Sequence, residues 1–154
     1  MNSDIPRSRA RSAGHAILRI IVAFPIACFS GALATDITYA ATANMMWADF
    51  SAWLLAVGII MGGLAALGGL AYLLSNRQAN ARSSAWPVVL GSLLVLVLAL
   101  FDNFVHSRDA WTSVVPTGLT LSAITVVAML ITVWFGSVRL DRYESDSQLS
   151  GARR

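Results

Sequence analysis

The chain has 154 residues, of which 56% are hydrophobic and 12% are charged, and this composition is too apolar for an ordinary soluble domain. The formal net charge of +3 comes from arginines that flank apolar segments, so it does not indicate nucleic-acid binding. The single cysteine, Cys28, excludes an intrachain disulfide and a Cys-x-x-Cys metal or redox motif. The composition therefore predicts an integral protein of the lipid bilayer.

The N-terminal part of the chain changes from polar to apolar. Residues 1–14 carry three arginines among serine and alanine without hydrophobic periodicity, which predicts a disordered basic cytoplasmic tail. The apolar segment that follows predicts a membrane helix over about 16–39. Pro25 lies inside this helix and is expected to kink it, because proline removes one backbone hydrogen bond.

The second apolar segment, from Ser51 to Leu74, carries no charge and predicts a helix over about 50–74, with Asp49 as its N-cap. Glycine and alanine recur along it at spacings of three and four residues, which places them near one face of the helix. Small residues on one face let the backbones of other helices approach closely. The expected helix-packing residues on this face are Gly58, Gly62, Ala66 and Gly69.

Two further helices are expected after a polar loop over residues 75–86. The third begins near Pro87, and its apolar run ends at Phe101 after about 22 Å, so it is expected to continue to His106 in order to cross roughly 30 Å of hydrocarbon. The fourth helix is expected over about 117–137, with Gly118 and Ser122 among its packing residues. The helices over about 16–39, 50–74, 87–106 and 117–137 make one transmembrane domain, residues 15–138, and a cytoplasmic tail follows at 139–154.

The arginines predict the orientation of these four crossings. Ten of the eleven arginines fall on the side that holds both termini, and Arg108 falls on the other side. Arginine and lysine accumulate in cytoplasmic loops, so the side with the termini is expected to be cytoplasmic. The predicted fold class is an all-α membrane protein, a four-transmembrane-helix bundle with N-in/C-in topology. Its predicted location is the bacterial inner (cytoplasmic) membrane, as a multi-pass protein.

Polar residues gather at the predicted outer end of the bundle. A rise of 1.5 Å per residue places Asp36 of the first helix at about the depth of Asp102 on the third. Asp102 and His106 lie one helical turn apart, so the carboxylate can orient the imidazole. In a straight first helix, Asp36 points away from the small-residue face, and it joins the others only if that helix is bent or packed on two sides. The candidate outer-face polar site consists of Asp36, Asp102, Asn103, His106 and Asp109.

Two readings of these polar residues remain open: they hold the outer loops together, or they form a functional site. No metal-ligand motif or nucleotide-binding loop occurs in the sequence, and no metal or other cofactor is predicted in the chain itself. A transition metal held by His106 with carboxylates, or copper held by His106 with Met45 and Met46, is an alternative without a supporting motif. Haem cannot be held by His15 and His106 of one chain, because these histidines are expected at opposite ends of the bundle. A haem held between two protomers, or by His106 with a methionine, stays open as an alternative without a supporting motif.

Three stretches carry a family resemblance. They are AFPIACFSGALATDITYAAT at 23–42, WADFSAWLLAVGIIMGGLAALGGL at 47–70 and HSRDAWTSVVPTGLTLSAITV at 106–126. Together they resemble an uncharacterised bacterial four-helix integral membrane protein family, some members of which are joined to a Rieske iron–sulfur domain. The resemblance covers about 16–137 and implies a membrane anchor or a redox-associated subunit, because a Rieske domain transfers electrons.

The expected function is therefore that of a membrane anchor or partner subunit in an envelope redox and electron-transfer system, with a redox protein as partner. A small homo-oligomeric transporter is the alternative, and it would have to dimerise because four helices leave little room for a pathway. A membrane enzyme that uses Asp102 and His106 as an acid–base pair is the second alternative. A role other than enzyme is favoured, since no catalytic motif is present.

Cysteine labelling in intact cells tests the predicted orientation. In a Cys28→Ala background, Asn44→Cys should react with a membrane-impermeant maleimide, and Gln78→Cys should react only after the cells are lysed. The reason is the excess of arginine beside Gln78, which should keep that connection in the cytoplasm. The reverse labelling pattern would place both termini outside.

Overall fold

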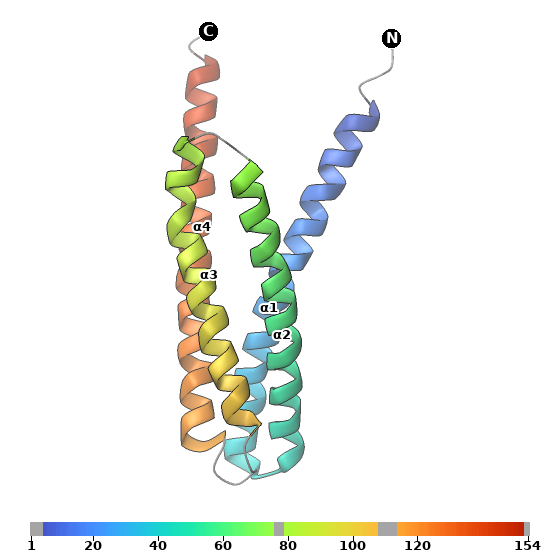
Figure 1. Ribbon diagram of the computed structural model, residues 1–154, viewed down its shortest axis with the longest axis vertical. Helices are drawn as coiled ribbons and strands as arrows, with labels where there is room; N and C mark the ends of the chain where they lie inside the picture. The colour runs from blue at the N-terminus through green and yellow to red at the C-terminus, as the bar shows by residue number, and fades with distance from the viewer. Residues whose placement is uncertain (1–4, 76–78, 108–113, 153–154) are drawn as a thin grey trace.

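The computed structural model describes residues 5–75, 79–107 and 114–152 and consists of four long helices (Figure 1). These are α1 (Ile5–Thr42), α2 (Met45–Ser75), α3 (Ala79–His106) and α4 (Leu119–Ala152), with a short π-helical turn, η1 (Val114–Gly118), before α4. Each contains a segment long and apolar enough to cross a membrane: Ile20–Thr42, Met45–Ala71, Trp86–His106 and Val114–Val138, the last including η1. The predicted all-α four-helix bundle is confirmed, and the chain is a multi-pass membrane protein.

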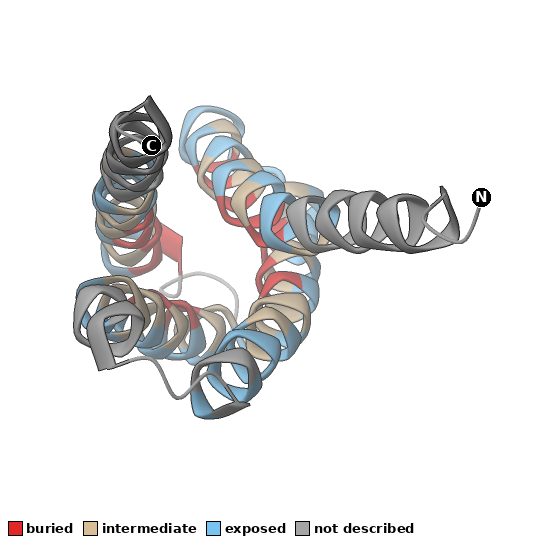
Figure 2. Ribbon diagram, turned by 90° about the horizontal axis from the view of Figure 1, so that it is seen from above, coloured by how far each residue is buried: buried red, intermediate tan, exposed pale blue. Residues whose placement is uncertain are grey.

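The helices form a ring in which each lies beside two others. α1 and α3 both pack against α2 and α4, and buried residues lie on the inward faces of the helices (Figure 2). Both chain termini lie at one end of the bundle, which we call the terminal end (Figure 1). The last turns of α1 and α3 and the first turns of α2 and η1 lie at the other end, which we call the connection end.

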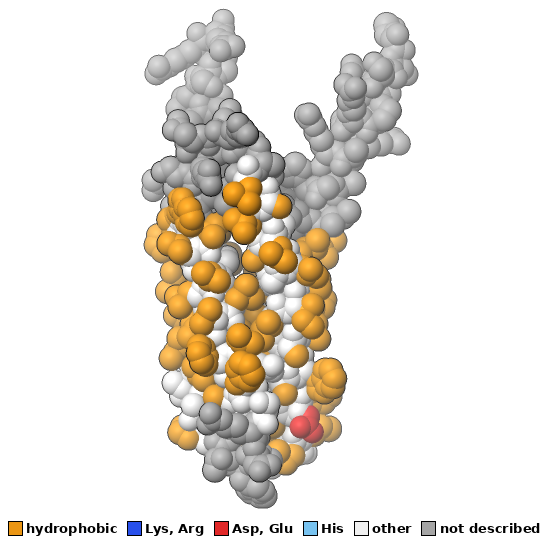
Figure 3. All heavy atoms as spheres, in the orientation of Figure 1, with side chains coloured by type: hydrophobic (Ala, Val, Ile, Leu, Met, Phe, Trp, Pro, Cys, Tyr) orange, Lys and Arg blue, Asp and Glu red, His pale blue; other side chains and the backbone are white. Residues whose placement is uncertain are grey.

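Hydrophobic side chains cover the outside of the bundle as well as its core. The core is a cluster of small and large apolar residues: Phe29, Ala32, Leu55, Val95, Ala99 and Met129. Large side chains such as Trp53 and Trp134 are more than two-thirds exposed, and hydrophobic side chains cover most of the described face seen in Figure 3. Exposed apolar surface of this extent fits lipid surroundings, where it meets hydrocarbon instead of water.

Two of the predicted packing glycines lie where α2 meets its neighbours. A Cβ at Gly58 would lie 2.6 Å from Cε1 of Phe29, and a Cβ at Gly62 would lie 2.8 Å from Cδ2 of Leu96. Gly69 differs from the prediction, because a Cβ there has no neighbour within 4 Å, and Ala66 is exposed. Both line a cavity between the helices, so the close packing of α2 ends near Gly62.

The helices extend beyond the predicted bounds. α1 begins at Ile5, inside the segment expected to be disordered, and α4 continues to Ala152, through the expected tail. These extensions contain alanine, arginine, leucine and glutamate, which have high helix propensity. α3 likewise begins at Ala79, so the expected loop is partly helical and Pro87 lies inside the helix.

Local side-chain chemistry decides where α2 and α4 begin. Asn44 Oδ1 accepts a hydrogen bond of 3.1 Å from the Met46 backbone N–H, so Asn44 caps α2 and the prediction of Asp49 as N-cap is wrong. Val115 has φ −117° and ψ 126°, because the following Pro116 disfavours helical geometry. The regular helix α4 therefore starts at Leu119, and buried Gly118 belongs to the turn η1.

A matched pair of glycine substitutions in α2 tests this packing. Gly58→Ala should destabilise the protein by about 1–3 kcal/mol, because the new methyl group overlaps the buried ring of Phe29. Gly68→Ala has open space around it and should be neutral or stabilising by up to about 1 kcal/mol, since alanine favours helix. Thermal unfolding in one detergent measures both effects. A larger loss for Gly68→Ala would contradict the assigned contact face.

Candidate functional site

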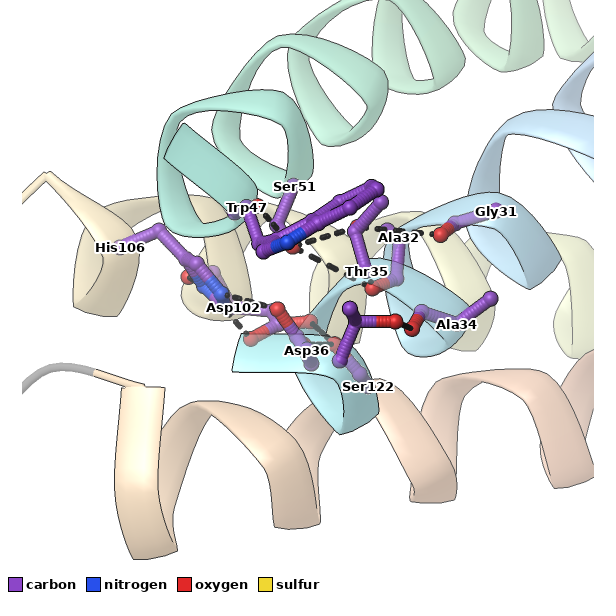
Figure 4. A network of polar contacts seen from close by, with 11 residues as sticks. Gly31, Ala32, Ala34, Thr35, Asp36, Trp47, Ser51, Asp102, His106 and Ser122 are labelled. Atoms are coloured by element: carbon purple, nitrogen blue, oxygen red, sulfur yellow. Dashed lines mark hydrogen bonds and ion pairs between the residues drawn. The ribbon is translucent and has the colours of Figure 1, made fainter. Parts of the chain in front are cut away.

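A group of four polar side chains is buried near the connection end of the bundle (Figure 4). Asp36 comes from α1, Asp102 and His106 from α3, and Ser122 from α4. We call these four residues the carboxylate cluster. Asp36, Asp102 and the His106 side chain are 0% exposed, and Ser122 is 2% exposed. Three helices that are distant in sequence thus bring their polar groups together within the membrane-spanning part of the bundle.

The imidazole of His106 lies between the two aspartates. Its Nε2 lies 2.8 Å from Oδ1 of Asp36, and its Nδ1 lies 2.9 Å from the backbone oxygen of Asp102. Nδ1 is also 3.2 Å from Oδ1 of Asp102, within ion-pair distance, although that oxygen has no hydrogen bond. The N–H at Nδ1 is directed to the closer backbone oxygen. The ring is therefore fixed by α1 on one side and by its own helix on the other.

Ser122 joins the two carboxyl groups. Its Oγ lies 2.5 Å from Oδ2 of Asp36 and 2.6 Å from Oδ2 of Asp102. Both distances are short for hydrogen bonds between oxygen atoms. One hydroxyl on α4 therefore connects α1 and α3, which do not lie side by side in the ring.

Apolar layers enclose the carboxylate cluster along the bundle axis. Ala32 and Ala99 lie about one turn toward the terminal end and belong to the main core. Toward the connection end, Tyr39, Ala48 and Val114 form a second buried hydrophobic group. These layers separate the cluster from solvent, which makes each of its internal hydrogen bonds more important to stability.

Asp36 reaches the cluster because α1 packs on two sides. On the side toward α2, the Thr35 and Ser51 hydroxyl oxygens lie 2.7 Å apart, and Ser51 is fully buried. On the other side, Asp36 contacts His106 of α3 and Ser122 of α4. Adjacent residues of one helix point about 100° apart, so Thr35 and Asp36 serve different neighbours. Packing of α1 on two sides is one of the two conditions under which Asp36 was expected to join the site.

The hydrogen-bond geometry indicates which shared protons the carboxylate cluster can accommodate. A serine hydroxyl has one hydrogen, so Ser122 can donate to only one of the two carboxyl groups. The second short contact needs a proton on the other carboxyl group, which then donates to Ser122 Oγ. Without that proton, two oxygen atoms that can only accept would face each other at 2.5–2.6 Å. The two short contacts therefore fit one proton shared between Asp36 and Asp102 through Ser122.

The contact between Asp36 and His106 fits a second shared proton. The backbone oxygen of Asp102 can only accept, so we assign a hydrogen to Nδ1 of His106 from this hydrogen bond. The contact between Nε2 and Asp36 Oδ1 then holds one more proton, either on the ring or on the carboxyl group. With both shared protons present, the carboxylate cluster has zero net charge.

The sequence identified part of this site. Asp36, Asp102 and His106 lie together, whereas the half-buried Asn103 adds no hydrogen bond or ion pair to the described cluster. Asp109 lies outside the described residues. Ser122 was expected to serve helix packing, and its bridging role was missed. Its position two α-helical turns before the buried Met129, on the small-residue face of α4, was the available signal.

Metal ligation receives no geometric support in the part of the chain that the structure describes. No group of three or more His, Cys, Asp or Glu side chains is arranged there to hold a metal ion. Both ring nitrogens of His106 already have protein partners. Met46, a ligand in the copper alternative, is half-exposed at the start of α2. The arrangement is suited to holding and passing protons.

Removing the bridging hydroxyl tests its importance. Ser122→Ala should cost about 1–3 kcal/mol or more, because it leaves two buried carboxyl oxygens without their shared partner. Ser30→Ala, on the exposed face of α1, is the control and should change stability by less than about 0.5 kcal/mol. Thermal unfolding of both variants in the same detergent gives the comparison. Equal stability would mean that Ser122 does not bridge the carboxyl groups.

Comparison with known proteins identifies the family of this chain. A family model described as a predicted membrane protein, DUF2231, matches residues 14–145. This range includes all four membrane-spanning segments and every member of the carboxylate cluster. Searches of curated proteins and of solved structures gave no match. The chain belongs to the DUF2231 family of predicted membrane proteins.

Proposed function

We propose that this protein is a proton-binding membrane subunit that works with an electron-transfer partner in the bacterial cell envelope. The observation that carries the proposal is the pair of short contacts from Ser122 to Asp36 and Asp102. Those contacts fit a proton shared between two buried carboxyl groups. A protein that only needed to fill this position could use apolar side chains without burying ionisable groups.

The carboxylate cluster provides alternative positions for each of its two shared protons. One proton moves between Asp36 and His106 along a contact of 2.8 Å. The other moves between Asp36 and Asp102 by a concerted shift through the Ser122 hydroxyl, which donates one hydrogen as it accepts another. Asp36 takes part in both exchanges. The four side chains therefore form a relay that connects α3 and α4 through α1.

The depth of the carboxylate cluster favours proton exchange near one membrane surface. Asp36 lies six residues before the end of its span at Thr42, or about 9 Å, and Asp102 lies about 6 Å from the end at His106. With the N-in/C-in orientation that the arginines favour, this surface faces the outside of the bacterial inner membrane. We propose that protons are released to or taken from that side.

The electron-transfer partner is proposed from the resemblance to proteins joined to a Rieske domain. Proton transfer accompanies many electron-transfer steps, and a buried neutral cluster can supply or accept the proton. The same site gives less support to the alternatives. A transporter places its coupling site near the midplane, and an enzyme needs access for a substrate, but Asp102 and His106 are covered.

A pair of Asp→Asn variants tests the proposal. In reconstituted bilayers, infrared difference spectra between acidic and alkaline pH should contain a buried carboxylic-acid band that Asp102→Asn weakens. Asp49→Asn, which alters an exposed carboxylate, should leave that band unchanged. A band insensitive to Asp102→Asn would contradict proton binding at the carboxylate cluster.

The same variants separate the redox role from proton binding. In native membranes, deletion of the gene should lower the rate of substrate-driven respiratory electron transfer. Asp102→Asn at normal abundance should reproduce the loss, whereas Asp49→Asn should not. An unchanged rate after deletion would contradict the electron-transfer role and leave the infrared result intact.

A further inference from the structure

A cavity of about 560 Å³ lies between the four helices in the half of the bundle toward the terminal end. All four helices contribute to it, for example Pro25 and Phe29 of α1, Gly69 of α2, Leu96 of α3 and Val133 of α4. It differs from the carboxylate cluster in place and in character. Its volume falls within the range of small-molecule sites, about 300–1,000 Å³.

The burial of its lining shows how the cavity is oriented. Phe29, Val95 and Met129 are buried and form its inner end, whereas Val22, Leu70 and Val133 are exposed and lie nearer the terminal end. Along α1, the distance from Val22 to Phe29 is about 10 Å. The cavity therefore opens toward the terminal end and closes against the hydrophobic core, entirely within the membrane-spanning segments.

The lining is suited to a hydrocarbon chain. Among the described residues that line the cavity, Ser92 and Thr132 have the polar side chains, and Thr132 Oγ1 already donates to the backbone oxygen of Ala128. Water needs two to four polar partners to occupy a cavity stably, and these two hydroxyl groups are the polar side chains that the described lining offers it. A quinone ring, with carbonyl groups on opposite edges, has the same two hydroxyl groups as partners.

A single extended chain is much narrower than a helix, which is about 10 Å in diameter with its side chains, and it can enter the cavity from the surrounding lipid.

The positive charge at the terminal end indicates which class of lipid supplies the acyl chain. Seven arginines lie in the described helix segments that extend beyond the spans at the terminal end, where the cavity opens: Arg7, Arg9, Arg11, Arg19, Arg82, Arg139 and Arg142. Basic residues next to membrane helices attract anionic headgroups. We propose that the cavity binds one acyl chain of an anionic phospholipid, whose headgroup lies at the arginine-rich end of the bundle.

Adjacent glycines in α2 provide a matched test. Gly69 lines the cavity and Gly68 does not, and a Cβ at either has no neighbour within 4 Å. Gly69→Leu should fill the cavity, whereas Gly68→Leu adds the same side chain outside it. The wild-type protein, purified in mild detergent, should retain close to one phosphatidylglycerol per chain by mass spectrometry of extracted lipid. Gly69→Leu should retain about tenfold less, and Gly68→Leu should retain the wild-type amount.

Ala66→Leu, which also lines the cavity, gives a second filling variant should Gly69→Leu fail to fold. Delipidated protein in neutral-lipid nanodiscs should gain thermal stability when phosphatidylglycerol replaces phosphatidylcholine, and the cavity-filling variants should lose this gain. An equal loss of lipid in Gly68→Leu, or wild-type retention in both filling variants, would overturn the proposal. Retention of a quinone or of zwitterionic lipid in place of phosphatidylglycerol would also overturn it.

Discussion

Two carboxyl groups and one imidazole share a single buried site, and they must satisfy one another there. Ser122 lies within 2.6 Å of both carboxyl groups, while His106 links Asp36 to the last turn of α3. Loss of one partner would leave an ionisable group unpaired in apolar surroundings, which is costly. This requirement fixes α1, α3 and α4 relative to one another at the connection end of the bundle.

Different contacts hold the helices together in the two halves of the bundle. Toward the connection end, the carboxylate cluster and the Thr35–Ser51 hydroxyl pair hold all four helices together. In the middle, Gly58 and Gly62 bring α2 against its neighbours. Beyond Gly62 the small residues of α2 no longer contact another helix, and the 560 Å³ cavity replaces those contacts. One end is thus closed and polar inside, and the other is open and apolar.

The carboxylate cluster and the cavity are separate, and this separation matters for the proposed functions. Proton binding at the carboxylate cluster requires a site without competing water, and the layer that contains Phe29, Val95 and Met129 lies between it and the cavity. A lipid chain in the cavity would extend this apolar layer toward the terminal end. On the other side, the second buried group of Tyr39, Ala48 and Val114 lies between the carboxylate cluster and the nearer membrane surface, so the proposed proton exchange takes this shorter route at the connection end.

The sequence by itself determined the four membrane crossings and the depth of the polar residues. Length and hydrophobicity are properties of each segment alone, so they identify helices, and the rise per residue placed Asp36 and Asp102 at one level. The tertiary structure decided what those residues contact. Whether Ser122 packs or bridges, and whether Gly69 touches a helix or lines a cavity, depends on the rotation and spacing of helices far apart in the chain. Helix periodicity gives a residue's face but does not specify which neighbour that face meets.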